Sequence, residues 1–222
     1  MASFVVKILE SSFINHDVKR FIVEKPAGYQ FIPGQATDVS INLPEWKDQL
    51  RPFTFISLNE WSYLEFAIKI YDEHEGVTKQ LGKTNAGAEL ILHDAFGTIR
   101  YKEPGIFIAA GTGITPFIAI FRDLYNRKLI EGNSLILSNK TAEDIILPHD
   151  LKQMLGNNFI NVLTREGVIG FLERRIDRRF LVETILDFSQ HFYLCGPELF
   201  VKEISGHLLN LGASADTLIF EQ

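Results

Sequence analysis

Hydrophobic and polar residues alternate in short runs along the first hundred positions of the chain. A period of two is typical of a strand with one buried face. Turn residues such as Pro33-Gly34 separate the runs. The runs that predict strands are Phe4–Leu9, Val18–Glu24, Thr37–Leu43, Phe53–Leu58 and Tyr63–Ile70. Short strands at this spacing favour a small antiparallel barrel or sandwich, and a helical pattern follows at Val77–Leu81.

The pattern changes after Glu103-Pro104-Gly105, where wholly apolar runs begin to alternate with helical periodicity. The predicted strands are Ile106–Ala110, Ser134–Leu137, Phe159–Leu163, His191–Leu194 and Thr217–Phe220. The predicted helices are one that ends near Lys128, then Leu147–Leu155, Arg178–Phe188 and Glu198–Leu211. This βαβ series predicts a parallel, doubly wound sheet. We therefore expect two domains, residues 1–102 and 103–222.

The segment Gly111-Thr112-Gly113-Ile114-Thr115-Pro116 joins the first of these apolar strands to a helix. The two glycines permit a tight turn and close approach of a ligand, and Pro116 fits the first turn of a helix. A strand, a glycine turn and a helix N-terminus together form a site for an anionic or dinucleotide ligand. An ordinary buried strand with a glycine turn explains the same residues about equally well, since the full G-x-G-x-x-G fingerprint is absent.

Composition narrows the classes of function. The 222 residues are 46% hydrophobic and 23% charged, which is ordinary for a soluble globular protein. A net charge of −6 argues against a general nucleic-acid binder. A single cysteine, Cys195, excludes an internal disulfide and a thiolate-ligated iron–sulfur cluster, and no metal site is expected. No apolar run reaches the roughly 20 residues of a membrane span and no signal-peptide pattern is present, so a cytoplasmic protein is expected.

Five short segments, taken in their order along the chain, carry a resemblance to a known family. They are Arg51–Ser57, Gly76–Leu81, Asp94–Gly97, Gly111–Pro116 and Tyr193–Pro197. In this order they resemble the ferredoxin–NADP⁺ reductase superfamily of flavin-dependent reductases, and Phe31–Gln35 and Ser138–Ile145 also look like family segments. The resemblance implies a six-stranded antiparallel barrel that binds flavin, followed by a doubly wound parallel sheet that binds a nicotinamide dinucleotide.

The resemblance places the flavin on the barrel domain. The implied contacts are Arg51, Pro52, Phe53, Thr54, Ile68, Lys69, Ile70, Gly76, Val77 and Thr78. Arg51 would bind the flavin phosphate, because a guanidinium offers a planar fork of donors; a solvated surface charge is the alternative, as it is for Lys69. Phe53 stands where the family usually has Tyr, so it would keep the packing on the flavin and lose a hydroxyl, unless it is a core aromatic. Thr78 near a helix start favours a pyrophosphate, hence FAD rather than FMN, although an N-cap role fits as well.

The resemblance also implies a nicotinamide site in the second domain. Its residues are Gly111, Thr112, Gly113, Thr115, Pro116, Cys195, Gly196 and Pro197, with the thiol near the nicotinamide C4. A lone cysteine is otherwise more often a small buried hydrophobe. Thr164 and Arg165 are similar to the pair that binds the 2′-phosphate in NADPH-using members, whereas NAD sites more often place a carboxylate on the ribose. NADPH is therefore favoured over NADH, with a solvated loop pair as the alternative.

The implied reaction is hydride transfer from NADPH C4 to flavin N5. Thr54, Cys195 and Glu221 would lie at the reacting atoms, Glu221 because many members carry a Glu near the flavin at this position. The electrons would then pass to a separate acceptor such as ferredoxin, flavodoxin or an oxygenase component. Two alternatives stay open: an NADH-dependent free-flavin or quinone-type reductase, and a non-catalytic electron-transfer subunit that binds flavin.

Overall fold

The computed structural model describes residues 2–167, 169 and 171–220. Its contacts group the chain into two compact units. The first unit holds the chain up to Gly97 together with Thr115–Ile120, and the second holds Thr98–Ile114 and the chain from Phe121 onward. The expected boundary between residues 102 and 103 stays a prediction. None of the helices in the described part of the chain is long and apolar enough to span a membrane.

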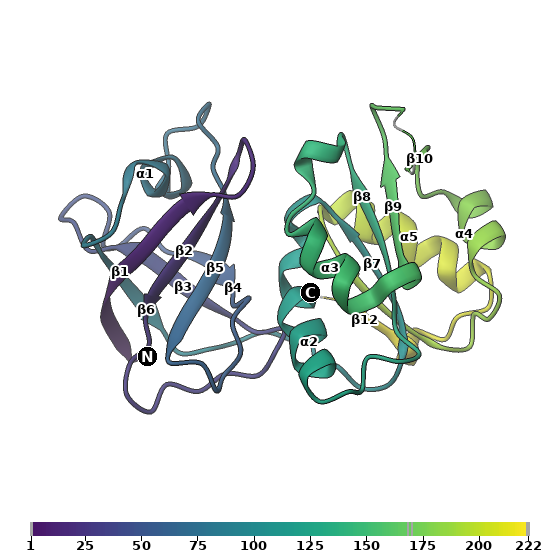
Figure 1. Cartoon of the computed structure of the whole chain (residues 1–222), viewed down its shortest axis with the longest axis horizontal. Helices are drawn as coiled ribbons and strands as arrows, with labels where there is room; N and C mark the ends of the chain where they lie inside the picture. The colour runs from purple at the N-terminus through teal and green to yellow at the C-terminus, as the bar shows by residue number, and fades with distance from the viewer. Residues whose placement is uncertain (1, 168, 170, 221–222) are drawn as a thin grey trace. The chain divides into compact units, whose positions relative to one another are not determined.

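The first unit is built on an antiparallel sheet of six strands (Figure 1). They are β1 (Ser3–Phe13), β2 (Val18–Glu24), β3 (Ala36–Ile41), β4 (Arg51–Thr54), β5 (Tyr63–Lys69) and β6 (Glu89–His93), in the order β4-β3-β6-β1-β2-β5. Just beyond β4, the Ile56 N–H donates to the Glu65 carbonyl of β5 at 2.9 Å. The two edges of the sheet therefore meet in a nearly closed barrel, which confirms the expected architecture. Alternation along the chain located five of the strands and missed β6.

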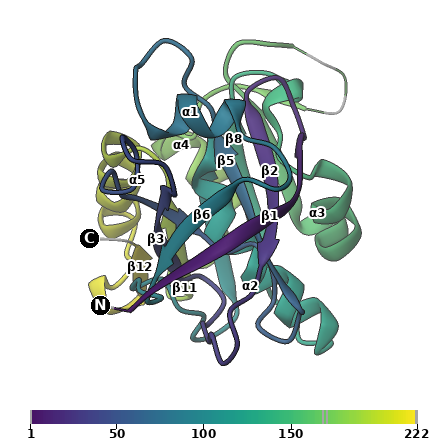
Figure 2. The same cartoon turned by 90° about the vertical axis from the view of Figure 1, so that its left-hand side faces the viewer.

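Side chains at every second position fill the barrel. Leu64, Phe66 and Ile68 of β5 are buried in this core, as period-two alternation requires. Helix α1 (Val77–Lys83) adds Val77 and Leu81 to the same cluster, so α1 covers one end of the barrel (Figure 2). The apolar residues of this segment thus pack into the barrel core, and the first of them, Val77, is the residue at which the helix begins.

The second unit is a parallel sheet with helices on both faces (Figures 1 and 2). Its strands are β7 (Gly105–Ala110), β8 (Ser134–Asn139), β9 (Phe159–Leu163), β10 (Leu172–Glu173), β11 (His191–Cys195) and β12 (Leu218–Phe220), in the order β10-β9-β8-β7-β11-β12. The α-helices of this part of the chain are α2 (Thr115–Asn126), of which Thr115–Ile120 is grouped with the first unit, α3 (Pro148–Leu155), α4 (Arg178–Thr184) and α5 (Glu198–Asn210). The 3₁₀ turns are η1 (Gly111–Ile114), η2 (Ala142–Asp144), η3 (Gly156–Asn158) and η4 (Ala215–Thr217). The doubly wound parallel sheet is confirmed.

Several details differ from the sequence prediction. Strand β1 continues to Phe13 rather than ending at Leu9, and β4 spans Arg51–Thr54 rather than Phe53–Leu58. Helix α4 ends at Thr184 because Ile185 is extended, whereas the periodicity predicted a helix to Phe188. Strand β10 has only two residues, both exposed, so it carries no periodic signal that could have revealed it.

Alternate residues of β7 face different helix layers. Ile108 belongs to the buried cluster that includes Phe180 of α4 and Ile204 of α5. The ring of Phe107 instead lies 4.6 Å from that of Phe121 in α2. From β7 the chain winds outward through β8 and β9, then returns to place β11 on the other side of β7. The topological switch point of the sheet is therefore between β7 and β11.

Candidate functional site

The switch point brings two glycine-containing turns together. Ala109 of β7 pairs with Cys195 of β11, and both strands end within one residue of this pair. Strand β7 continues into η1, and β11 continues into Gly196 and Pro197. In open parallel sheets, ligands bind beyond the carboxyl ends of the strands at this point of the topology. The structure thus joins residues that are more than eighty positions apart in the sequence.

Backbone contact between these turns leaves room only for glycine. A Cβ on Gly113 would lie 2.4 Å from the Cys195 carbonyl oxygen and 2.7 Å from the Gly196 nitrogen. A Cβ on Gly196 would lie 3.2 Å from the Ala110 Cβ. Gly111 has φ of +54°, a left-handed conformation that glycine adopts without strain, and it has open space around it. The result is a bare backbone surface that a dinucleotide can approach closely.

The residues after η1 suit an anion. Helix α2 begins at Thr115, and Pro116 occupies its first turn, as expected. That turn, which the structure describes in full, contains no acidic residue. The partial positive charge of a helix N-terminus suits a ligand such as a phosphate group.

Cys195 occupies the last position of β11, with its side chain half-buried at the switch point. Pro197 is the N-cap of α5, so the Cys195-Gly196-Pro197 segment passes directly from a strand to a helix. Cys195 thus lies at the carboxyl edge of the sheet, and its role beside a nicotinamide stays a prediction.

Thr164 and Arg165 follow β9, two strands away from the switch point. Both are exposed. The Thr164 N–H and hydroxyl donate to the Asn139 carbonyl at 2.9 and 3.2 Å, and the Arg165 N–H donates to the Lys140 carbonyl at 3.0 Å. These bonds hold the loop against the end of β8. Thr164 can therefore offer its hydroxyl to a phosphate only by leaving the Asn139 carbonyl.

Two other charged residues of this region, Glu166 and Arg174, are already engaged. The Glu166 carboxylate accepts from the Ala142 N–H at 2.8 Å, which ties it to η2. The Arg174 guanidinium lies 2.6 Å from Glu183 and 3.6 Å from Asp177. Within residues 2–167, 169 and 171–220, no side-chain hydrogen bond or ion pair of Arg165 is found. Arg165 is therefore better placed than Arg174 to bind a 2′-phosphate.

The barrel strand β4 carries the first group of predicted flavin residues. Arg51 is exposed, and its Nη1 donates to the Leu50 carbonyl at 2.7 Å. Pro52 is exposed, whereas Phe53 is half-buried and packs against the barrel core. Thr54 is half-buried and pairs with Ala36 of β3. The strand thus presents a guanidinium and a threonine at the surface of the barrel.

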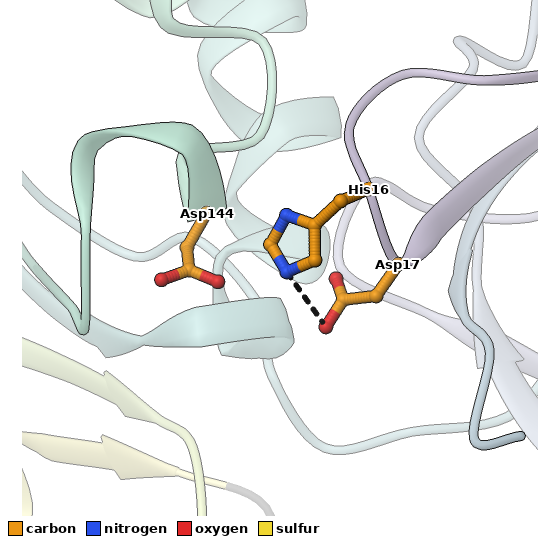
Figure 3. Close-up of side chains that lie close together, drawn as sticks. All are labelled: His16, Asp17 and Asp144. Carbon is orange, nitrogen blue, oxygen red and sulfur yellow. Dashed lines mark ion pairs between the residues drawn. The ribbon is translucent and has the colours of Figure 1, made fainter.

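The side chains of Ile68, Lys69 and Ile70 are engaged within the barrel unit. Ile68 and Ile70 are buried in the barrel core. The Lys69 ammonium pairs with the Asp17 carboxylate, which also lies 3.5 Å from His16 Nε2 (Figure 3). A structural ion pair therefore describes the Lys69 side chain better than a solvated charge. Asp144, also labelled in Figure 3, belongs to the second unit, where it closes a capping box with Thr141.

The two ends of helix α1 differ in their hydrogen bonding. Its N-cap is Gly76, which makes no side-chain cap bond, so the alternative role of Thr78 as N-cap is wrong. Its fully described first turn holds no acidic residue. At the opposite end, the buried Lys19 ammonium donates to the carbonyls of Gly82 and Thr84 at 3.0 and 2.6 Å, and burial lowers the pKa of Lys19. The partial positive charge at the start of the helix suits an anion.

The second unit is similar to a known domain family. Residues 107–205 match the family model described as the oxidoreductase NAD-binding domain. This segment is thus similar to that domain family. It contains most of the switch-point residues, so the glycine contact lies inside the matched domain. The oxidoreductase class expected from the motifs is supported by this match.

Two relatives resemble the chain beyond the NAD-binding domain. NADH-cytochrome b5 reductase 1 of Aspergillus oryzae is 28% identical over 235 residues, which cover 95% of this chain and 78% of the relative. NADH-cytochrome b5 reductase 2 of Mycosarcoma maydis is 27% identical over 214 residues, which cover 86% of this chain. The match spans 61% of the length of that relative.

Solved structures share the whole fold. The flavohem-like FAD/NAD-binding domain of nitric oxide dioxygenase from Vibrio cholerae has a TM-score of 0.88 at 21% identity, covering 98% of this chain and 97% of that one. A ferredoxin NADP⁺ reductase from Neisseria gonorrhoeae, solved with FAD and NADP, has a TM-score of 0.86 at 22% identity, covering 99% and 98%. The barrel and the NAD-binding domain together thus have the fold of the ferredoxin–NADP⁺ reductase superfamily, and the resemblance read from the motifs is confirmed.

Some site residues lie outside this description or escaped the sequence prediction. Glu221 is outside the described residues, and its predicted role is not tested. Asn139 and Tyr193 were not among the predicted site residues, although both lie in segments that carried the resemblance, Ser138–Ile145 and Tyr193–Pro197. The buried Tyr193 hydroxyl accepts from the N–H groups of Lys102 and Glu103 and so fixes the segment that leads into the NAD-binding domain.

Proposed function

We propose that this protein is an FAD-dependent NAD(P)H oxidoreductase that passes electrons to a separate acceptor protein. The observation that carries the proposal is the glycine-only contact of Gly113 with the Cys195-Gly196 backbone at the switch point of an oxidoreductase NAD-binding domain. A close backbone surface at the carboxyl edge of a parallel sheet suits a dinucleotide.

In this proposal the NAD-binding domain orients the nicotinamide coenzyme. The backbone of Gly111-Thr112-Gly113 and the start of α2, with Thr115 and Pro116, hold the phosphates. Cys195, Gly196 and Pro197 line the nicotinamide pocket, and the half-buried thiol packs beside the ring near C4. The residues act by holding donor and acceptor in near-attack geometry and by excluding water.

The residues of the barrel fit a flavin with two phosphate groups. The first turn of α1 has neither an acidic residue nor a side-chain cap, and the N–H groups at a helix start suit a pyrophosphate. Exposed Arg51 binds phosphate, Phe53 and Thr54 pack against the flavin, and the backbone of 68–70 meets the ribityl chain. When bound, FAD supplies an acceptor for the hydride at N5 and a carrier that releases electrons singly or as a pair.

The preferred coenzyme in this proposal is NADPH. Arg165 is exposed beyond the end of β9 and can pair with a 2′-phosphate, while Glu166, a carboxylate that could select NADH by binding the ribose, is engaged with η2. NADH is the second candidate, since both relatives are named NADH-cytochrome b5 reductases.

We favour a heme protein of the cytochrome b5 kind as the electron acceptor. The support is the names of the relatives, which replace the expectation of ferredoxin or flavodoxin drawn from the motifs alone. A ferredoxin is the second candidate, because a ferredoxin NADP⁺ reductase shares the fold over the whole chain.

Steady-state assays on the FAD-loaded protein test this proposal. With NADPH or NADH as donor, reduction of cytochrome b5 is compared with that of ferredoxin, flavodoxin, a quinone and free flavin. The proposal expects cytochrome b5 to be the fastest. Faster turnover with free flavin or quinone would favour that class of reductase, and no turnover with any acceptor would favour a non-catalytic electron-transfer subunit.

A further inference from the structure

Asn139 is a buried amide with an unused donor. It is the last residue of β8 and is 6% exposed. Its Nδ2 is buried and has no hydrogen-bond partner. A buried donor without a partner destabilises the folded state, and such groups in natural proteins call for an explanation.

The face and the edge of the sheet on which Asn139 lies indicate what could pair with its free donor. Side chains at alternate positions of a strand share a face, so Asn139 lies on the same face as Leu135 and Leu137. Leu135 pairs with Phe107, whose ring contacts Phe121 of α2, so this is the face covered by α2. Asn139 also lies one step beyond the last pair of β7 with β8, Ala110 with Ser138, and η1 lies against β8. The amide is therefore at the carboxyl edge, beside the glycine turn.

The order of the strands places this edge on the path of the nucleotide. In the proposed function, on which this inference rests, the nicotinamide end lies at the switch point of β7 and β11, and the adenosine 2′-phosphate lies at Arg165 beyond β9. Strand β8 is between β7 and β9. Neighbouring strands are about 4.8 Å apart, so a dinucleotide that joins the two ends must cross the end of β8. Asn139 is the residue at which β8 ends.

We infer that the Asn139 carboxamide is a binding residue for the central part of the dinucleotide, where the pyrophosphate joins the adenosine ribose. Its Nδ2–H₂ group donates to an oxygen of that segment. The terminal torsion of an amide side chain is broad and nearly two-fold, so a half-turn exchanges Nδ2 and Oδ1 without moving the backbone. The backbone carbonyl of Asn139 is meanwhile held by Thr164, which fixes the residue in place. The unpaired donor of the nucleotide-free protein is satisfied when the coenzyme binds.

The test compares Asn139→Leu with a matched control, Asn161→Leu. Asn161 pairs with Leu137, so it lies on the same sheet face in the neighbouring strand, and its Oδ1 is also buried without a partner. It lies in the middle of β9, away from the carboxyl edge. Calorimetric titration of the FAD-loaded proteins with NADP⁺ and with NAD⁺ gives the affinities, and thermal melting without nucleotide gives the stabilities.

Asn139→Leu is expected to weaken both nucleotides on the order of tenfold or more, because a hydrogen bond to a charged group is lost. Its melting temperature without nucleotide should equal or exceed that of the wild type, since an unpaired buried donor is removed. Asn161→Leu should bind both nucleotides like the wild type. Asn139→Asp keeps the shape of the side chain, but an ionised carboxylate cannot donate a hydrogen bond and repels a phosphate. This variant should therefore bind both nucleotides at least as weakly as Asn139→Leu, and it replaces Asn139→Leu in the test if the leucine variant does not fold.

Two outcomes overturn the inference. Wild-type affinity in the Asn139 variants shows that the amide does not meet the nucleotide. A lower melting temperature in Asn139→Leu, together with affinities no weaker than those of Asn161→Leu, assigns Nδ2 to a buried water and a structural role. The proposed function fails separately, if the wild-type protein itself binds neither NADP⁺ nor NAD⁺.

Discussion

Gly113→Ala tests the contact at the switch point most sharply. The added methyl carbon would lie 2.4 Å from the Cys195 carbonyl oxygen, 2.6 Å from its carbon and 2.7 Å from the Gly196 nitrogen. All three are backbone atoms at the end of β11, so no side-chain rotation relieves the overlap. Ordinary contact begins at 3.4 Å, so the two turns must separate by 1.0 Å.

The size of this displacement sets the expected effect. A misplacement of this order at a reacting centre costs on the order of 100-fold in rate, and overpacking destabilises a fold by about 1–3 kcal/mol. We therefore expect the variant to reduce its flavin with NADPH or NADH on the order of 100-fold more slowly than the wild type. The content of FAD should not change, because the barrel segments that bind it belong to the other unit.

The assay is anaerobic stopped-flow reduction of bound flavin, with FAD content and urea unfolding measured on the same samples. Gly206→Ala is the matched control: it lies inside α5 with nothing within 4 Å of the added carbon. It should reduce flavin normally and gain about 0.5–1 kcal/mol of stability. Wild-type rates in Gly113→Ala would refute the reasoning, and loss of FAD together with the rate would show a general unfolding instead.

Four further variants test other parts of the account. Arg51→Ala should purify folded but largely without flavin, and a full flavin complement would contradict its place at the phosphate. Cys195→Ala should slow single-turnover reduction of the flavin with little change in FAD content; an unchanged rate would leave the thiol a packing role. Arg165→Ala should lower kcat/KM for NADPH about tenfold or more and leave that for NADH nearly unchanged, whereas an equal loss for both would make Arg165 a structural charge. Tyr193→Phe should lower the free energy of unfolding in urea by about 1–3 kcal/mol, because the Tyr193 hydroxyl accepts from two backbone N–H groups. Burial raises the pKa of Tyr193 above 10.0, so the stability that this group contributes to the wild type should be present below pH 10.0 and fall as the pH rises above it. The phenylalanine variant should lack this pH-dependent loss.

The elements of the second unit were predictable because buried parallel strands are uniformly apolar. The pattern placed a strand at Ile106–Ala110, and β7 spans Gly105–Ala110. The glycine turn after it and Pro116 in the following helix were equally visible, since each has a local backbone reason. The antiparallel barrel was predictable from alternation, except for β6.

The contacts that give the site its geometry were not predictable in the same way. The closeness of Gly113 to Cys195 depends on the order of β7 and β11 in the sheet, which no local pattern encodes. The unpaired amide of Asn139 is visible only once its neighbours are placed. The N-cap of α1 was also hard to predict, because Thr78 has the chemistry of a capping residue but lies two positions after Gly76, the actual N-cap.

Anaerobic mixing of the FAD-loaded wild-type protein with one equivalent of NADPH, and separately of NADH, tests the central claim most directly. The account predicts that the visible absorbance of the bound flavin disappears with at least one coenzyme, faster with NADPH, and returns when an acceptor protein is added. A flavin that stays bound and oxidised in the presence of both coenzymes would contradict the claim that this chain carries a hydride from NAD(P)H to FAD.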